Sequence, residues 1–253
     1  MSDKILIQMK NIEKSFGYIK ALDGCDFYVN EGETTAIVGD NGSGKSTLMK
    51  ILNGNLKPDK GSIFIENKEY PNITINQAIS LGIQTVYQDL ALDNYKSCVE
   101  NVFLGNEIMI GNLFINKKKM KEETQELLAK LNIKIDDLNT PVGHLSGGQR
   151  QGIAIARALN QKSRILILDE PTAAMGIKET HKVMELLKKL KHNEQKITQI
   201  LISHNLFQAF DIADSIHIMR AGKCIARINT KDSTPSEVHD LILEKEKKIE
   251  DEQ

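Results

Sequence analysis

The chain has 253 residues, of which 40% are hydrophobic and 26% charged, and its formal net charge at pH 7 is −1. These are ordinary values for a globular protein, so a packed core is expected and disorder is not. The balanced charge argues against a nucleic-acid partner, which would require a basic surplus or stripe. The sequence shows neither a signal-peptide run at its start nor the roughly 18 apolar residues of a membrane span. We therefore expect a cytosolic protein.

Three cysteines, Cys25, Cys98 and Cys224, lie far apart in the sequence. Their number is odd, and none stands in the spacing of a metal-ligand motif. A scattered set of this kind is typical of proteins in a reducing compartment. We therefore expect reduced thiols that are mostly buried as small core residues.

The chain opens with two strand-like runs. Residues Ile5–Met9 alternate between apolar and polar as an edge strand would, and Ala21–Val29 alternate in the same way. The turn between them carries two aromatic residues, Phe16 and Tyr18. An aromatic side chain in such a turn either plugs the core or stacks on the flat ring of a ligand, and the turn alone leaves both open.

A phosphate-binding loop follows. The apolar run Thr34–Val38 predicts a buried strand, and Thr47–Leu52 predicts the start of a helix. The loop between them consists of Gly39, Asp40, Asn41, Gly42, Ser43, Gly44, Lys45 and Ser46. This spacing of glycines before Lys-Ser, between a strand and a helix, is the phosphate-loop pattern. Glycines let the backbone N–H groups point at phosphate oxygens, and the helix adds its partial positive end.

The polar residues of this loop have a chemical reason. Lys45 would neutralise the β- and γ-phosphates of a nucleotide, and the Ser46 hydroxyl would complete the shell of a bound Mg²⁺. A plain glycine-rich turn would not need Lys-Ser at this place. With ATP held here, Phe16 is the first choice for stacking on the adenine ring, and Tyr18 is the second.

The next segment brings a further polar side chain to a strand end. Ser62–Ile65 predicts a short strand, Ile75–Leu81 a helix, and Ile83–Tyr87 a buried strand that ends at Gln88. Ligands bind at the carboxyl ends of parallel strands. Gln88 can therefore reach a metal ion or a water, although a glutamine in a surface loop would look the same.

From Ala91 to about Leu138 the strand signals stop, and the sequence predicts helices at Cys98–Leu104 and Asn116–Leu131. The second helix begins at an asparagine cap. The three lysines of its first turn, Lys117–Lys119, are unfavourable to the helix dipole. They form either a solvated charge run or a patch that faces a protein or anionic lipid. We expect this part to be a helical lobe inserted into an α/β core.

The lobe ends in a glycine-rich hexapeptide before a strong helix former, Ile153–Leu159. The hexapeptide is Leu145, Ser146, Gly147, Gly148, Gln149 and Arg150. Two glycines and a serine here predict a helix N-terminus with bare amides, which is a second candidate anion site. One nucleotide does not need two such sites from one chain. The second site is therefore expected to face a nucleotide held by a second copy or by a related subunit.

Two further strands end in polar residues. The apolar strand Arg164–Leu168 is followed by Asp169 and Glu170, and the buried strand Ile197–Ile202 is followed by Ser203 and His204. Asp169 would hold Mg²⁺ directly or through water, and Glu170 would polarise the attacking water. His204 can contact a γ-phosphate or that water. Taken alone, the acidic pair could stand at a strand end by chance, and a lone histidine usually has a structural role. Beside a phosphate loop they predict a hydrolytic site.

Taken together, these residues resemble the ATP-binding cassette (ABC) ATPases over nearly the whole chain, to about Arg227. The hexapeptide Leu145–Arg150 is the specific part, because phosphate loops occur in many NTPases whereas this signature marks one superfamily. The resemblance makes Gly39–Ser46, with Thr47 beside it, the Walker A loop, and it makes Phe16 the aromatic that stacks on adenine.

The remaining motifs take family roles by the same resemblance. Gln88 looks like the Q-loop glutamine, which bonds Mg²⁺ and the water and senses the transporter. Ile165–Glu170 resembles Walker B with its catalytic glutamate, and His204 resembles the switch histidine. Thr140–Gly143 occupies the position of the X-loop. The signature residues expected to contact the other subunit's nucleotide are Leu145, Ser146, Gly147, Gly148 and Gln149.

The resemblance also implies a fold, namely an α/β P-loop NTPase core with a mixed sheet, an N-terminal antiparallel β subdomain and an inserted helical subdomain. We expect one cassette domain at residues 1–228, with its core at 1–89 and 160–228 and its helical subdomain at about 90–159. Residues 229–253 are expected to form a charged C-terminal helix and tail, helical from Thr234 to Glu250.

Two stretches, Asp169–Gly176 and Ser203–Asp214, are similar to the ATPase subunits of bacterial monosaccharide importers. In that group two cassettes often occur in one chain, and a chain with one copy of each motif must dimerise, with a homodimer as the first expectation. The resemblance implies ATP-driven uptake of a sugar, integral membrane permease subunits as partners, and a sugar-binding protein acting indirectly. The subunit would be cytoplasmic and peripheral on the inner face of the membrane.

One departure from the family pattern concerns the D-loop, which usually ends in aspartate and here ends in Gly176. In the family that aspartate helps to couple the two sites of the dimer. The departure therefore puts communication between subunits, rather than ATP binding, in question. A soluble ABC ATPase that acts as a regulatory or assembly factor without a transporter is the alternative function.

Overall fold

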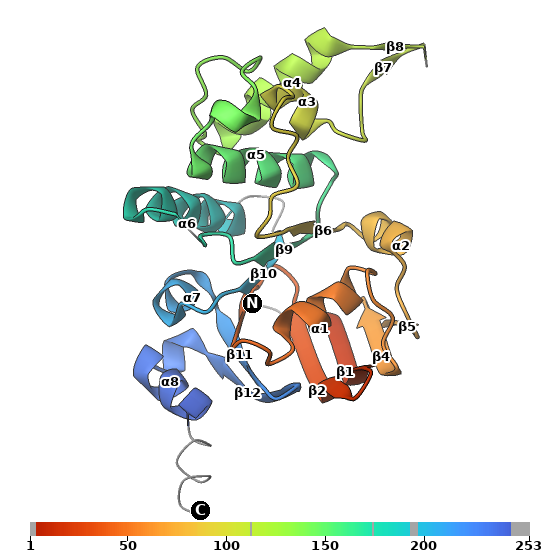
Figure 1. The fold of residues 1–253 in the computed structure, drawn as a ribbon, viewed down its shortest axis with the longest axis vertical. Helices are drawn as coiled ribbons and strands as arrows, with labels where there is room; N and C mark the ends of the chain where they lie inside the picture. The colour runs from red at the N-terminus through yellow and green to blue at the C-terminus, as the bar shows by residue number, and fades with distance from the viewer. Residues whose placement is uncertain (1–3, 112, 174, 193–196, 244–253) are drawn as a thin grey trace, which may run out of the picture.

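The computed structural model describes residues 4–111, 113–173, 175–192 and 197–243. Within those ranges the chain forms two large sheets, a short hairpin and eight α-helices. Figure 1 shows a helical lobe at one end and a last helix at the other, with both large sheets between them. The lobe contains α3 (Cys98–Val102), α4 (Lys117–Lys130) and α5 (Gly147–Asn160), and the last helix is α8 (Pro235–Leu243).

The first sheet is antiparallel. In spatial order its strands are β2 (Ile19–Asn30), β1 (Ile5–Phe16), β4 (Lys60–Ile65) and β5 (Lys68–Tyr70). β1 lies inside the sheet and extends to Phe16, so the prediction of a short edge strand at Ile5–Met9 is wrong. Alternation of apolar and polar residues reports that one face of a strand is buried, but it does not report how many neighbours the strand has.

The second sheet is mixed. In spatial order its strands are β12 (Lys223–Asn229), β11 (Ser215–Arg220), β3 (Thr34–Val38), β10 (Thr198–Ile202), β9 (Ile165–Asp169) and β6 (Ile83–Val86). Neighbouring strands are parallel except for β12, which returns antiparallel to β11. The antiparallel first sheet and the mixed second sheet confirm the predicted fold class.

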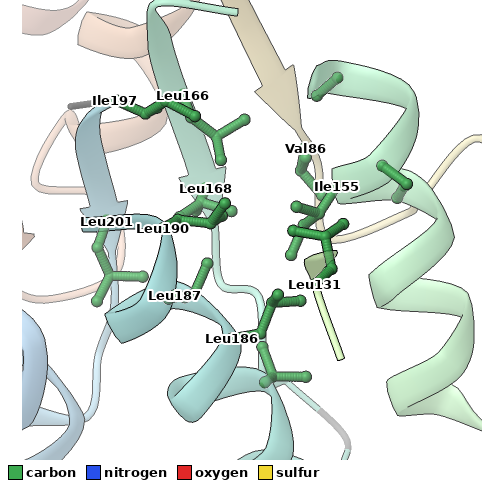
Figure 2. Packing of buried hydrophobic residues seen from close by; sticks show 14 of the residues in the cluster. Val86, Leu131, Ile155, Leu166, Leu168, Leu186, Leu187, Leu190, Ile197 and Leu201 are labelled. Atoms are coloured by element: carbon green, nitrogen blue, oxygen red, sulfur yellow. The ribbon is translucent and has the colours of Figure 1, made fainter. Parts of the chain in front are cut away.

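Both faces of the second sheet are buried. Because consecutive residues of a strand point to opposite faces, Leu166 and Leu168 of β9 belong to one hydrophobic cluster and Ile165 and Ile167 to the other. A helix, α6 (Ile177–His192), covers the first face. Figure 2 shows its leucines beside β9 and β10, namely Leu186, Leu187 and Leu190. This double burial explains why the strands read as continuous apolar runs in the sequence.

The other helices fill connections around the sheets. They are α1 (Lys45–Leu52), α2 (Ile75–Ser80) and α7 (Leu206–Ile212), with short 3₁₀ turns at Val142–His144 and Thr230–Asp232. α1 packs on the face of the second sheet opposite α6, where Leu48 and Ile51 are fully buried. Across the described part of the chain, no helix is both long and apolar enough to cross a membrane.

The inserted lobe follows the prediction at its helices and departs from it at one hairpin. Asn116 caps α4 by accepting a hydrogen bond from the Lys119 N–H at 3.1 Å, as its sequence predicts. Between α3 and α4, however, Met109–Ile110 (β7) and Phe114–Ile115 (β8) form a two-stranded hairpin. The expectation of no strands from Ala91 to Leu138 is therefore wrong. Strands of two exposed residues each carry no alternation that a sequence pattern could reveal.

The C-terminal helix is anchored to the second sheet. Val238 of α8 is fully buried, and Arg220 at the end of β11 donates a hydrogen bond to the Leu241 carbonyl at 3.1 Å. The structure shows helix from Pro235 to Leu243. The remainder of the helix predicted to reach Glu250 lies outside the described residues.

The cysteines and one histidine form part of the interior. Cys25 and Cys98 are buried, Cys224 is partly buried and all three are free, as expected. His217 in β11 is buried, with Nε2 2.9 Å from the Tyr28 carbonyl and Nδ1 3.1 Å from Cys224 Sγ. Because a carbonyl can only accept, Nε2 carries the proton of the neutral ring. Burial, helped by the Arg227 guanidinium, lowers the pKa of His217 to about 3.

We expect His217 to make the fold sensitive to acid. The unfolded chain takes up this proton at pH 6.5, whereas the folded chain resists it until about pH 3. Stability from the neutral ring is therefore present above pH 6.5 and is lost as the pH falls, at up to about 1.4 kcal/mol per pH unit. His217→Gln removes this titration, so its unfolding free energy should fall less steeply with acid than that of the wild type. Urea unfolding over this pH range measures both slopes, and equal slopes would contradict the assignment.

Candidate nucleotide site

The carboxyl ends of three parallel strands meet at one edge of the second sheet. In the sheet register, Ile202 of β10 is paired with Asp169 of β9 on one side and with Ile37 of β3 on the other. The phosphate loop follows β3, Glu170 follows β9, and His204 follows β10. Register alone therefore brings together three segments that are far apart in the sequence, at the edge where ligands bind in such sheets.

The phosphate loop needs its glycines for two reasons. Gly39 and Gly44 have φ angles of 145° and 102°, which other residues rarely adopt. In addition, a Cβ on Gly39 would lie 2.0 Å from the Met219 carbonyl oxygen, and one on Gly44 would lie 2.6 Å from the Ala21 carbonyl oxygen. The loop is thus pressed between β11 and β2. The Gly222 N–H also donates to the Ser43 carbonyl at 3.0 Å, so the β11–β12 turn braces the loop from behind.

Lys45 lies folded across the loop. Its Nζ donates hydrogen bonds to the carbonyls of Gly39 and Asp40, both at 2.8 Å, and to Ser43 Oγ at 3.3 Å. Only 7% of the residue is exposed. Burial lowers the pKa of Lys45, while the carboxylates of Glu170, Asp40 and Asp169 act in the opposite direction. The ammonium is thus held where it can meet a charged ligand of opposite sign.

The N-terminus of α1 is arranged to accept an anion. Its cap residue is Gly44, which has no side chain to satisfy the first N–H groups, and the first turn contains no acidic residue. These N–H groups and the positive end of the helix dipole therefore point at the loop. Ser46, in the first turn, is exposed, and Thr47 is half-buried. All the predicted phosphate-binding residues, 39 to 47, lie together at this one place.

The acidic pair and the histidine form the second part of the site. Burial and the neighbouring carboxylate of Glu170 raise the pKa of Asp169. Glu170 has a positive φ of 48°, and its N–H donates to the Ile202 carbonyl at 3.0 Å, which turns its side chain away from the strand direction. Its Oε1 lies 3.3 Å from His204 Nδ1. The structure therefore brings Glu170 and His204 into contact, next to Lys45.

Phe16 lies at the tip of the β1–β2 hairpin, paired with Ile19. Its side chain is 47% exposed and that of Tyr18 is fully exposed, so neither plugs the core. Ala21 and Leu22, a few residues further along β2, touch Gly44 of the phosphate loop. The hairpin tip thus stands beside the loop with an aromatic face available for stacking.

Gln88 is exposed two residues beyond the end of β6. It lines a cleft of about 290 Å³ together with Glu170 from the strand end and Gly147 from the start of α5. Within the part of the chain that the structure describes, no hydrogen bond joins residues 145–150 to residues 39–47. The signature therefore reaches the cleft beside Glu170 without being hydrogen-bonded to the phosphate loop of the same chain.

The signature departs from the prediction of bare amides. Ser146 Oγ accepts the Gln149 N–H at 3.3 Å, and Gln149 Oε1 accepts the Ser146 N–H at 3.0 Å, which makes a capping box. The Gln149 amide also donates to the Lys134 carbonyl at 2.9 Å. The backbone N–H groups of Ser146 and Gln149 therefore already have hydrogen-bond partners within the chain. Those of Gly147 and Gly148 make no hydrogen bond to other described residues and are the donors left for a ligand.

The D-loop lies beside the same signature. Gly176 precedes α6 and accepts the Thr180 N–H at 2.9 Å, and Ala174 of this loop lies outside the described residues. A Cβ on Gly147 would lie 3.6 Å from Glu179 Oε2. A carboxylate from the first turn of α6 therefore stands next to the signature glycines, although the usual aspartate is missing.

Two residues that the sequence did not single out tie the cleft together. Arg157 of α5 donates to the carbonyls of Leu90 and Ala91, both at 2.8 Å, and so fixes the segment after Gln88 to the signature helix. Gln151, 1% exposed, also lines the cleft, and its amide nitrogen has no partner among the described residues. Because polar residues on a helix usually face solvent, nothing in the sequence pattern marks Gln151 as buried or Arg157 as half-buried.

The oxygen groups at the site fit a hard divalent cation. The Ser46 hydroxyl, the Gln88 side-chain oxygen and the Asp169 carboxylate are the ligand types that Mg²⁺ prefers. Nucleotide phosphates would supply the rest of an octahedral shell.

The fold and this site define a P-loop NTPase of the cassette type, and the comparisons with known proteins agree. The sequence profile described as ABC transporter matches residues 22–173. The chain is 43% identical over 242 residues to the xylose/arabinose import ATP-binding protein XylG of Sulfolobus acidocaldarius, covering 96% of this chain and 94% of that protein. It is 40% identical over 244 residues to the fructose import ATP-binding protein FrcA of Rhizobium meliloti, covering 94% and 93%. The chain therefore belongs to the ABC transporter family and is an ATPase of that family.

Solved structures give the same result. A nucleotide-free ATP-binding cassette from an ABC transporter superposes with a TM-score of 0.81 at 30% identity, covering 95% of both chains. A cassette bound to ADP and Pi, solved as a dimer in a post-hydrolysis state, superposes with a TM-score of 0.74 at 28% identity, covering 88% of this chain and 98% of that one. The predicted cassette fold is therefore confirmed, and ATP is the nucleotide of the site.

The two glycines Gly39 and Gly42 offer a matched test of the loop. Gly39→Ala places a Cβ 2.0 Å from backbone, whereas at Gly42, with a φ of 79°, the added Cβ meets nothing within 4 Å. We expect Gly42→Ala to cost roughly 1–2 kcal/mol of stability through strain alone. Gly39→Ala should cost clearly more and should abolish ATP binding. Thermal unfolding and nucleotide titration measure both, and equal losses would contradict the described packing of the loop.

Proposed function

We propose that the chain is the ATP-hydrolysing subunit of an importer for a monosaccharide, and that it works as a head-to-tail dimer. The observation that carries the proposal is the division of the site within one chain. The phosphate loop lies at the sheet edge with Glu170 and His204, whereas the free amides of Gly147 and Gly148 begin α5 of the lobe, and no hydrogen bond among the described residues joins residues 145–150 to the loop. A triphosphate contacted by both kinds of surface requires a second cassette.

The sugar part of the proposal rests on relatives. The matched proteins named above import xylose, arabinose or fructose by name, and this chain aligns with them over nearly its whole length. It also aligns with the ribose import ATP-binding protein RbsA of Clostridium tetani at 36% identity, covering 96% of this chain and 48% of that protein. These are pentoses and a hexose, so the substrate class is a monosaccharide.

Binding uses the groups of the phosphate loop. The Lys45 ammonium leaves the Gly39 and Asp40 carbonyls and pairs with the β- and γ-phosphates, while the first N–H groups of α1 donate to phosphate oxygens. Phe16 stacks on adenine from the hairpin tip. In the dimer, the amides of Gly147 and Gly148 in one chain donate to the γ-phosphate held by the other, with Leu145, Ser146 and Gln149 shaping that surface.

Hydrolysis depends on Glu170 and His204. Glu170 accepts a hydrogen bond from a water and orients it toward the γ-phosphorus, with Gln88 holding the water from the other side of the cleft. A new P–O bond forms to the water oxygen as the bond to the bridging oxygen of ADP breaks. His204, 3.3 Å from Glu170, is placed to contact the γ-phosphate and to keep the carboxylate in position. Mg²⁺ held by Ser46, Gln88 and Asp169 would neutralise charge that develops on the phosphates.

Two chains that clamp two nucleotides couple this chemistry to transport. Because ATP binds between the chains only when they are closed, it shifts the equilibrium toward the closed dimer, and hydrolysis reopens it. Integral permease subunits attached to the cassettes follow this motion, and a sugar-binding protein delivers the substrate from outside. The chain would therefore act in the cytoplasm, on the inner face of the membrane.

Glu170→Gln separates binding from hydrolysis. The amide keeps the shape of the side chain but cannot act as a base, so we expect ATP binding to persist and turnover to fall by roughly 10²–10⁴. Phosphate release and nucleotide titration measure the two effects. The exposed Glu126 on α4 provides a control, and Glu126→Gln should hydrolyse ATP at the wild-type rate. Undiminished turnover in Glu170→Gln would remove this residue from the chemistry.

Lys45→Ala tests the phosphate contact. Removing the buried ammonium should weaken ATP binding by at least about tenfold, the equivalent of one charge-assisted hydrogen bond. Lys57→Ala is the matched control, because Lys57 lies shortly after the same helix and is exposed. Equal ATP affinity in Lys45→Ala and Lys57→Ala would contradict the assignment of the loop.

The importer itself is tested in cells. We expect the chain to co-purify with an integral membrane subunit. Loss of the gene should abolish uptake of one labelled monosaccharide, which the wild-type protein restores and Glu170→Gln does not. A trapped Glu170→Gln protein should also form an ATP-dependent dimer. ATPase activity without any membrane partner would favour the alternative, a soluble regulatory or assembly factor.

A further inference from the structure

The β7–β8 hairpin stands apart from the rest of the lobe. Figure 1 shows it projecting beyond α3 and α4 at the end of the molecule. Met109 pairs with Ile115 and Ile110 with Phe114, and the hairpin is closed at its base by the Asn116 N–H, which donates to the Ile108 carbonyl at 2.6 Å. Asn116 is also the cap of α4. The hairpin is therefore continuous with the first turn of that helix.

The hairpin exposes large apolar side chains. Leu113 is 78% exposed and Phe114 71%, and three more apolar residues are at least 43% exposed, namely Met109, Ile110 and Ile115. A group of this kind at one projecting tip is unlike the scattered single hydrophobic residues of an ordinary surface. Neither ATP binding nor packing of the lobe uses these side chains, so the hairpin tip is available for a contact outside this chain.

Positive charge gathers where the hairpin joins α4. Lys117, Lys118, Lys119 and Lys121 are all exposed, and α4 has no acidic residue in its first turn. Within the described ranges only Lys119 has an ion-pair partner, Glu123 at 3.8 Å. The acidic residues of α4 begin at Glu122, after all four of these lysines.

This order of charges is the reverse of what stabilises a helix. Cations at the N-terminus oppose the helix dipole, and the same lysines placed in the last turn would favour it. The three lysines of the first turn, Lys117–Lys119, therefore cost the isolated protein stability. A layer of negative charge against the hairpin end of α4 would offset that cost.

We propose that the β7–β8 hairpin is a membrane-surface contact, in which the apolar tip enters the headgroup region of an anionic bilayer and the lysines at its base pair with lipid phosphates. Exposed apolar side chains beside a cluster of basic ones are the combination that interfacial segments use. Lysines on flexible stems suit a diffuse layer of charge, whereas recognition of a fixed protein carboxylate favours the planar fork of arginine. The described hairpin and the first turn of α4 contain no arginine.

This contact goes beyond the proposed function and does not depend on it. It requires neither nucleotide nor permease, so it is measurable on the isolated full-length protein. Its effect would be to hold the lobe against the membrane plane and so fix how the cassette is oriented beneath its transporter.

Flotation with lipid vesicles tests the proposal. The full-length protein is mixed with vesicles of phosphatidylcholine alone or of phosphatidylcholine with phosphatidylglycerol, at low and at physiological salt. We expect binding to the anionic vesicles, weaker binding at the higher salt, and little binding to the neutral ones.

Two variants locate the contact. Lys117→Gln/Lys118→Gln/Lys121→Gln should weaken binding to anionic vesicles roughly a hundredfold, about fivefold for each lysine removed. Leu113→Ser/Phe114→Ser should also reduce binding by at least tenfold, because the tip loses its apolar area. The controls, with exposed residues elsewhere on the surface, are Lys57→Gln/Lys68→Gln/Lys130→Gln and Ile75→Ser/Ile79→Ser, which should bind as the wild type does.

Three results would overturn the proposal. The first is equal binding of the wild type to neutral and anionic vesicles, or no binding to either, which needs no variant at all. The second is wild-type vesicle binding by both hairpin variants, with their melting temperatures and ATP affinities unchanged. The third is a hairpin variant that binds vesicles as the wild type does but no longer co-purifies with membrane subunits in detergent. That result would make the partner of the hairpin a protein. Failure of the wild-type protein to bind ATP would contradict the proposed function, but it would not change what the vesicle experiment says about the hairpin.

Discussion

The whole site depends on the pairing register of β3, β10 and β9. Since Ile37, Ile202 and Asp169 lie across from one another, the three segments that follow them emerge at one level of one sheet edge. A shift of one residue in either pairing would turn the side chains that follow to the wrong face of the sheet. Burial on both faces opposes such a shift, because the apolar residues of these strands already fill places in two hydrophobic clusters.

Most of the site could be predicted because it consists of local motifs. The phosphate loop, Asp169 with Glu170, and His204 each follow an apolar strand, and strands of that kind are easy to recognise in a sequence. The sequence does not predict the contacts between these motifs. Arg157 reaches two carbonyls more than sixty positions earlier in the chain, and the Gly222 N–H supports the phosphate loop from the far end of the sequence. Such contacts depend on packing, which leaves no periodic pattern in either segment.

The wrong predictions also arise because a local sequence pattern does not report contacts with distant segments. β1 reads as an edge strand because its neighbour β4 follows some fifty residues later, and the β7–β8 hairpin is too short to show alternation. The signature is a case in which the predicted element is right but its hydrogen bonds are not predicted. Its two glycines and serine predict a helix start correctly, but only the structure shows that Ser146 and Gln149 cap each other and leave Gly147 and Gly148 as the available donors.

The place of β3 in the sheet has a consequence for how the protein is made. This strand is complete by residue 38, yet both of its neighbours, β10 and β11, come from residues 198–220. During synthesis the apolar strand must wait, unpaired on both edges, until most of the chain has left the ribosome. Pairings so distant in sequence form slowly, and open strand edges invite aggregation. The nucleotide pocket is therefore among the last parts of the molecule to be assembled, although its loop is among the first to be translated.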